Sequence, residues 1–197
     1  MKYILENFNY IFLFTLTLFQ IQFFLLNLYV KIVTKQKVRG KSFEASLFII
    51  CVVLLYSIVI LKMYIPNNII ILASLVPNLT VLKYLAIVFL FTGFSLGIFS
   101  SLNLGKSWRV GISSEMKTPL VQSGMYRIIR NPYFLSFSFI LVSLILTFSN
   151  ILVIGISILA FALIHKMILA EEAHLLKIHG NEYIEFMRKT SRYFPPF

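Results

Sequence analysis

The chain contains no aspartate, and its seven acidic residues are all glutamates. Without aspartate, a Ser-His-Asp catalytic triad is excluded. The single cysteine, Cys51, cannot form an intramolecular disulfide, and its place within an apolar segment predicts a buried, unreactive thiol. The few glycines form no phosphate-cradling loop. The chain also lacks a polar stretch long enough for a separate soluble domain, so we expect a single domain over residues 1–197.

What the chain has in abundance is apolar surface and positive charge. Hydrophobic residues make up 59% of the sequence, which is too many for a soluble domain and places the protein in the membrane class. The net charge of +11 would suggest nucleic acid in a soluble protein. Here, however, the Lys and Arg residues gather in three clusters, over 31–41, 106–130 and 166–192, separated by apolar spans. This pattern is typical of a membrane protein with positive loops on the inside, and we expect no nucleic-acid partner.

Apolar segments of about 20 residues predict membrane-spanning helices. Three such segments lie over 7–30, 45–65 and 84–105. The first is too long for the apolar part of a signal peptide and precedes no small-residue cleavage site, so we expect it to be retained. Residues 131–165 would form a helix of roughly 52 Å, far longer than the hydrocarbon core of about 30 Å. We therefore predict a hairpin of two helices, 133–148 and 151–167, joined at Ser149-Asn150.

The predicted fold is an all-α integral membrane protein with five transmembrane helices. The basic clusters follow the first, third and fifth spans, so all three lie on one side of the membrane. The charge rule makes that side cytoplasmic and places the N-terminus outside. Residues 106–132 and 168–197 then form cytoplasmic elements. Within the second of these we expect a helix leaving the membrane, a stop at Gly180, and a short amphipathic helix from Asn181 to Lys189. The residue usage favours a bacterial inner membrane.

Two polar groups flank the predicted hairpin. Asn131-Pro132 suits the start of a helix, because Asn is a good N-cap and Pro is favoured in the first turn. The free amides of such a helix end can also bind an anionic group. Glu171-Glu172 lies at the other end of the hairpin, where the acids are either simply solvated or bind an amine or a ribose hydroxyl. For Asn131-Pro132 and for Glu171-Glu172, the sequence leaves open both a purely structural role and a role in ligand binding.

Histidines offer little support for a metal site. There are three, His165, His174 and His179, and the last two are spaced poorly for one helical face. We expect no metal.

Over about residues 102–197, the order and spacing of several short motifs resemble the isoprenylcysteine carboxyl methyltransferase and phospholipid methyltransferase group of integral membrane enzymes. The matching residues are Leu104-Gly105, Trp108, Leu120-Val121, Gly124, Tyr126, Arg130-Asn131-Pro132, Glu171-Glu172, Leu175, Gly180, Tyr183 and Pro195. The first three spans resemble that group only in being apolar.

The resemblance implies a methyltransferase that uses S-adenosylmethionine on a lipid-like or small-molecule methyl acceptor. It further implies a cytoplasmic cofactor site formed by Thr118, Pro119, Leu120, Val121, Tyr126, Asn131, Pro132, Tyr133, Phe134 and Glu171. The acceptor would be an isoprenylcysteine-like carboxylate, a phospholipid amine or a small thiol. Only an amine acceptor would need a base, for which Glu172 and His165 are candidates.

The sequence departs from the family pattern at three positions. Asn131 stands where the family often has His, and Phe134 stands where it has Tyr. Met167 stands where a substrate-side Arg would be, so Lys166 and Met167 are the candidate substrate residues.

Two alternatives remain open from the sequence. One is an NADPH-dependent reductase of membrane lipids or sterol-type compounds. The other is a small transporter or scaffold without enzymatic activity, which would need polar residues within the spans, such as Gln20 and Gln22.

Overall fold

The computed structural model describes residues 7–34, 42–64, 75, 79–108 and 119–194. Regular structure in these ranges is helical, apart from one isolated parallel bridge between Ile129 and Ser191. The elements are α2 (Phe8–Thr34), α3 (Phe43–Tyr64), α4 (Thr80–Leu104), η2 (Gly105–Ser107), η3 (Gly124–Arg127), α5 (Pro132–Phe148), α6 (Ile151–His179) and α7 (Asn181–Lys189). The prediction of an all-α integral membrane protein is confirmed.

Four of these helices, α2, α3, α4 and α6, are long and apolar enough to cross a membrane. The fifth, α5, is apolar but has only 17 residues. At 1.5 Å per residue it extends about 26 Å, slightly less than the hydrocarbon core. A helix is thus present at each of the five predicted spans.

Two of the helices extend beyond the predicted spans. Helix α4 begins at Thr80 rather than at 84. Helix α6 does not end at 167 but continues without a break to His179, because the sequence contains no glycine or proline between Ile156 and His179. It ends where expected, at Gly180, whose φ of 54° is a conformation that favours glycine. The amphipathic helix α7 then occupies the predicted residues.

The tight hairpin between α5 and α6 is confirmed at Ser149-Asn150. Asn150 is fully buried and caps α6, because its side-chain oxygen accepts a hydrogen bond of 2.9 Å from the amide of Val153. On the other side of the turn, the carbonyl of Ser149 accepts a hydrogen bond of 2.8 Å from the amide of Leu75.

Helix α4 packs closely along α5, and small residues in α4 allow the approach. A Cβ atom added to Gly93 would lie 2.8 Å from the backbone oxygen of Ser136 in α5. A Cβ atom added to Gly97 would lie 2.7 Å from the ring of Phe19 in α2. Small residues at such spacing are a usual way to pack helices in a membrane, where closeness of backbones supplies the contact energy. Cys51 is buried in the core of this bundle, as predicted.

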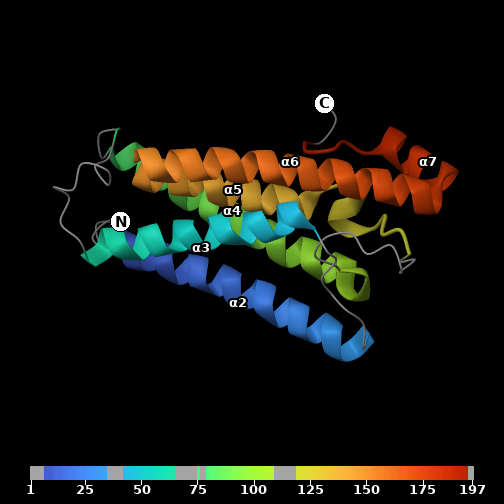
Figure 1. Cartoon of the computed structure of the whole chain (residues 1–197), viewed down its shortest axis with the longest axis horizontal. Helices are drawn as coiled ribbons and strands as arrows, with labels where there is room; N and C mark the ends of the chain where they lie inside the picture. Colours follow the sequence, from blue (N-terminus) through green and yellow to red (C-terminus); the bar gives the residue numbers. More distant parts are fainter. Residues whose placement is uncertain (1–6, 35–41, 65–74, 76–78, 109–118, 195–197) are drawn as a thin grey trace.

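The helices alternate in direction along the bundle (Figure 1). The turn between α5 and α6, the end of α3 and the start of α4 lie at one end. The ends of α2, α4 and α6, the start of α5 and the whole of α7 lie toward the other. This arrangement brings to one end of the bundle the segments in which the sequence predicts a functional site.

Candidate functional site

A cavity of about 140 Å³ lies among α2, α3, α5 and α6. Most of its lining is apolar or aromatic, and its polar side chains include Gln20, Ser42, Glu44 and Glu171. The remaining lining residues are Phe23, Ala45, Phe48, Ile49, Val52, Val53, Trp108, Tyr133, Phe134, Phe137, Met167 and Ala170. An apolar pocket with a few polar groups is the usual form of a small-molecule site.

Four residues predicted from the sequence line this cavity. Tyr133 and Phe134 come from the first turn of α5. Met167 and Glu171 come from α6, where their spacing of four places them on one helical face. Residues that the sequence assigned to cofactor and substrate therefore share one cavity.

An aromatic wall fixes the position of Tyr133. Its ring lies edge-on to Trp108, with 6.1 Å between ring centroids, and edge-on to Phe137 at 5.4 Å. Trp108 in turn contacts Phe23 of α2 at 5.7 Å. Edge-to-face pairs of this kind stabilise the packing beyond the area they bury. The wall joins α2, the residue after η2, and α5 at the cavity.

A second, smaller cavity of about 30 Å³ adjoins the first. The two share Gln20, Phe48, Val52 and Phe137 in their linings. The other residues of the second cavity are Leu16, Phe19, Leu55, Tyr56, Ile140, Leu141 and Leu144. Because nearly all of these are apolar, the second cavity is an apolar extension of the first between α2, α3 and α5.

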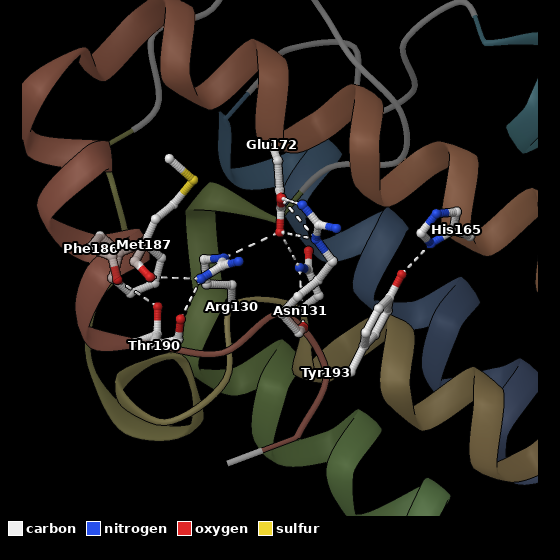
Figure 2. A network of polar contacts seen from close by, with 9 residues as sticks. Arg130, Asn131, His165, Glu172, Phe186, Met187, Thr190 and Tyr193 are labelled. Carbon is white, nitrogen blue, oxygen red and sulfur yellow. Dashed lines mark hydrogen bonds and ion pairs between the residues drawn. The ribbon is translucent and has the colours of Figure 1, made fainter. Parts of the chain in front are cut away.

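Glu172 does not line the cavity but is buried in a separate polar cluster (Figure 2). Its oxygens accept hydrogen bonds from Arg192 at 2.7–3.2 Å, from Asn131 at 3.0 Å and from Arg130 at 3.2 Å. We call Arg130, Asn131, Glu172 and Arg192 the C-terminal clasp. It ties the residues before α5, helix α6 and the segment after α7 together. The hydrogen bond that Arg192 donates to Glu172 raises the pKa of Arg192.

Arg130 completes the attachment of the C-terminal segment. Its guanidinium donates to the carbonyl of Met187 at 3.0 Å and to that of Thr190. Its backbone amide donates to the carbonyl of Ser191 at 2.8 Å. Because one side chain satisfies carbonyls at the end of α7 as well as Glu172, the clasp also terminates that helix.

The predicted capping role of Asn131 was wrong. Asn131 precedes Pro132 at the start of α5, but its side chain makes no capping hydrogen bond. Its amide instead donates to Glu172 and, at 3.3 Å, to the carbonyl of Arg192. A cap would use the side-chain oxygen of Asn131 as an acceptor, whereas these contacts use its side-chain NH₂ as a donor. The strong hydrogen bond to a charged acceptor sets the orientation of the side chain. The other half of the prediction, Pro132 in the first turn, is confirmed.

Three other predicted cofactor residues lie against α7 rather than on the cavity wall. Leu120 and Val121 pack against a cluster formed by Tyr126, Tyr183 and Phe186. Burial raises the pKa of the Tyr126 phenol, and the negative charge of Glu171 raises it further. Tyr126 is therefore within electrostatic reach of Glu171, although it does not line the cavity. Pro119 is exposed, and Thr118 lies outside the described residues.

The two remaining candidates occupy the outer side of α6. The ring of His165 forms a hydrogen bond through Nδ1 with the hydroxyl of Tyr193 in the C-terminal segment (Figure 2). Lys166 is exposed and within electrostatic reach of Glu44 at the start of α3. Neither residue belongs to the lining of the cavity.

Sequence reasoning missed Arg192 and the contribution of α2 and α3 to the cavity. Arg192 follows α7 in a basic segment, and the sequence alone does not distinguish a cation that binds Glu172 from one that is solvated. Gln20 and Glu44 did carry a signal, because a polar residue within an apolar span and an acid at the edge of one are both costly without a role. In the ranges that the structure describes, no three His, Cys or Glu residues gather as metal ligands would.

One curated protein similar to this chain is the nickel-cobalt-cadmium resistance protein NccN of Alcaligenes xylosoxydans xylosoxydans. The two are 31% identical over 93 residues, which is 47% of this chain and 44% of NccN. The alignment thus spans less than half of the length of that relative.

A family comparison agrees with the motifs. Residues 84–177 match the model of the isoprenylcysteine carboxyl methyltransferase (ICMT) family. This range contains most of α4, all of η2, η3 and α5, and nearly all of α6. It includes the four predicted residues on the cavity wall and three of the four residues of the clasp. Residues 84–177 of this chain are therefore similar to the isoprenylcysteine carboxyl methyltransferase family.

Proposed function

We propose that this protein is an S-adenosylmethionine-dependent methyltransferase that acts on a lipophilic acceptor within or at the membrane. The observation that carries the proposal is the cavity in which Tyr133, Phe134 and Glu171 converge. All three lie within the family-matched range. Glu171 belongs to a matching motif, and Tyr133 and Phe134 directly follow the matching Arg130-Asn131-Pro132. A shared cavity is the arrangement that a joint role in binding requires.

The cavity lining fits the chemistry of the cofactor. Aromatic side chains such as Trp108 and Phe134 offer faces for an adenine ring and for a sulfonium cation. The carboxylate of Glu171 is an acceptor for ribose hydroxyls or for an amino group. When bound, the cofactor supplies a methyl group already activated for transfer. The protein then needs mainly to hold the acceptor in line and to exclude water.

The geometry does not favour Glu172 as a base. Its carboxylate accepts five hydrogen bonds, most of them from two guanidinium groups. Such contacts stabilise the ionised form and leave little basicity. We propose instead that Glu172 holds Glu171 and the start of α5 in place. His165, bonded to Tyr193 and absent from the cavity lining, has the same difficulty.

The location follows from the same proposal. We infer a multi-pass protein of a bacterial inner membrane with its N-terminus outside and its C-terminus in the cytoplasm. The alternating helices support this orientation, because they bring the ends of α2, α4 and α6, at or beyond which basic residues cluster in the sequence, toward one end (Figure 1). The cofactor site would then face the cytoplasm, where the cofactor is made.

Calorimetric titration of detergent-purified protein with S-adenosylmethionine and S-adenosylhomocysteine tests the proposal. We expect micromolar binding that Glu171→Ala abolishes. The matched control is Glu185→Ala, which removes an exposed glutamate from α7. Well-folded protein that binds neither compound would refute the methyltransferase. Binding of NADPH in the same titration would support the reductase.

A further inference from the structure

The cavity extends beyond the family-matched range. Gln20 of α2 and Ser42 and Glu44 at the start of α3 lie outside residues 84–177, yet they contribute polar groups to the same cavity as Glu171. The family's shared segment accounts for the cofactor side of the proposed site. The segments that it does not include are therefore the natural place for features that select the acceptor of this particular protein.

Glu44 is held at the cavity wall by its neighbours. The hydroxyl of Ser42 donates to Oε2 of Glu44 at 3.0 Å. The same hydroxyl oxygen accepts from the amide of Ala45 at 3.2 Å and so caps α3. A glutamate in the first turn of a helix is also favoured by the helix dipole. The dipole explains why an acid is tolerated there, but it does not require that the acid line a cavity.

The charges on the cavity wall favour a cationic head group. Two carboxylates, Glu44 and Glu171, line it, and its described lining contains no Lys or Arg. Lys166 acts on Glu44 from α6, but it is exposed to solvent and absent from the lining. An anionic head group would lie beside two acidic side chains in a largely apolar space, which is unfavourable. An ammonium group would be attracted and could also accept a carboxylate as its hydrogen-bond partner.

The adjoining apolar cavity has room for part of a hydrocarbon chain. It begins at the shared residues Phe48 and Phe137 and continues toward Leu141 and Leu144. The phenol of Tyr56, which also lines it, is bonded to the hydroxyl of Thr17 at 2.8 Å. Because its polar atom is satisfied in this way, Tyr56 presents mainly ring carbon to the cavity. The narrow space suits a single chain rather than two.

We infer that the methyl acceptor is a single-chain amphiphile with an amine head, that Glu44 binds that head as an ammonium ion, and that the chain passes Phe137 into the second cavity. Before transfer, the ammonium group would give one proton to a carboxylate of the cavity, Glu44 or Glu171. The neutral nitrogen would then bond to the methyl carbon as the bond from that carbon to sulfur breaks. This inference rests on the proposed function and narrows its acceptor. Among the three acceptor classes that the family resemblance allowed, it selects an amine and rejects a carboxylate. Glu44 is in this view a specificity-determining residue.

The fluorescence of Trp108 provides the test, because it is the only tryptophan of the chain and lines the cavity. Protein in phosphatidylcholine nanodiscs is titrated with decylamine, decanol and decanoate. Probe concentrations are corrected by the partition of each probe into protein-free nanodiscs. We expect the fluorescence to change in a saturable way with decylamine, at a concentration about tenfold below that needed for decanoate. One hydrogen bond to a charged group is worth about this difference in affinity.

Variants at Glu44 assign the preference to its carboxylate. Glu44→Gln should remove the preference for decylamine, whereas Glu44→Asp, which keeps the charge, should retain most of it. Glu185→Gln, which removes an exposed charge from α7, should leave the preference unchanged. Thermal unfolding of each variant identifies loss of fold, and Glu44→Asp keeps the test decisive if Glu44→Gln does not fold.

Three outcomes would overturn the inference: equal binding of decylamine and decanoate, a preference unchanged by Glu44→Gln in folded protein, or no saturable change with any probe. Cofactor calorimetry on the same preparation separates this failure from that of the proposed function. Cofactor binding without the amine preference would refute the acceptor alone. The amine preference without cofactor binding would leave an amine-binding site in a protein that is no methyltransferase.

Discussion

Glu171 and Glu172 are neighbours on one helix, yet the structure gives them opposite surroundings. Helical geometry turns successive side chains by about 100°, so one points to the cavity and the other to the C-terminal clasp. Glu172 is buried and fully engaged with Arg130, Asn131 and Arg192, whereas Glu171 has an open cavity in front of it. A pair of identical residues thus separates into one that stabilises the fold and one that is available to a ligand.

The largest effect should come from removing each acid in turn. Glu172→Ala leaves two buried or partly buried guanidinium groups without their carboxylate, which costs about 3–5 kcal/mol. Glu171→Ala removes no hydrogen bond of the clasp and should cost less than about 1 kcal/mol, while it abolishes cofactor binding. Thermal unfolding in detergent and calorimetry measure the two properties.

The control for this pair is Glu185→Ala, which should change neither property. Equal destabilisation by Glu171→Ala and Glu172→Ala would contradict the separation of roles. So would cofactor binding that survives Glu171→Ala.

A smaller effect is expected at Asn131, the position where the family often has His. Asn131→Ala removes a buried hydrogen bond to a charged acceptor, worth about 2 kcal/mol. It leaves Arg130 and Arg192 on Glu172, so the protein should still fold and still bind the cofactor. The melting temperature and calorimetric affinity of the purified variant check this. Loss of cofactor binding with an unchanged melting temperature would show instead that Asn131 contacts the ligand.

The contrast between the two glutamates also shows how far a sequence can be read. Apolar length predicted the helices, and Ser149-Asn150 and Gly180 predicted where helices turn or stop, because each of these signals is local. The sequence motif gave Glu171-Glu172 as a unit. It could not divide their roles, because the division depends on Arg192, 20 residues away, and on how the C-terminal segment folds back.

The same reasoning explains the error at Asn131 and the omission of α2 and α3. An Asn before a Pro predicts a cap from local chemistry, but the hydrogen bond that Asn131 donates to Glu172 of another helix sets the orientation of its side chain. Gln20 and Glu44 could be noticed one at a time. Their convergence on one cavity depends on how α2 and α3 pack against α5 and α6, which no spacing within one segment specifies.

Arg192→Lys tests how much of the clasp depends on geometry rather than on charge. Arg192 donates through two nitrogens to Glu172, a two-point contact that lysine cannot reproduce. Because the Arg192 side chain is partly exposed, we expect a loss of only about 1 kcal/mol in thermal unfolding. A loss as large as that of Glu172→Ala would mean that the contact between Arg192 and Glu172 carries the whole clasp.

The smallest effect is expected at the outer edge of the clasp. Tyr193→Phe removes the hydroxyl that bonds to the exposed ring of His165 and leaves every contact of Glu172 in place. A hydrogen bond that water can replace contributes little, so the melting temperature should correspond to a change below about 0.5 kcal/mol. Methyl transfer, once an acceptor is known, should continue at nearly the original rate. A large loss of rate without loss of stability would show that Tyr193 orients His165 for proton transfer. The base would then be His165 rather than a carboxylate of the cavity lined by Glu44 and Glu171.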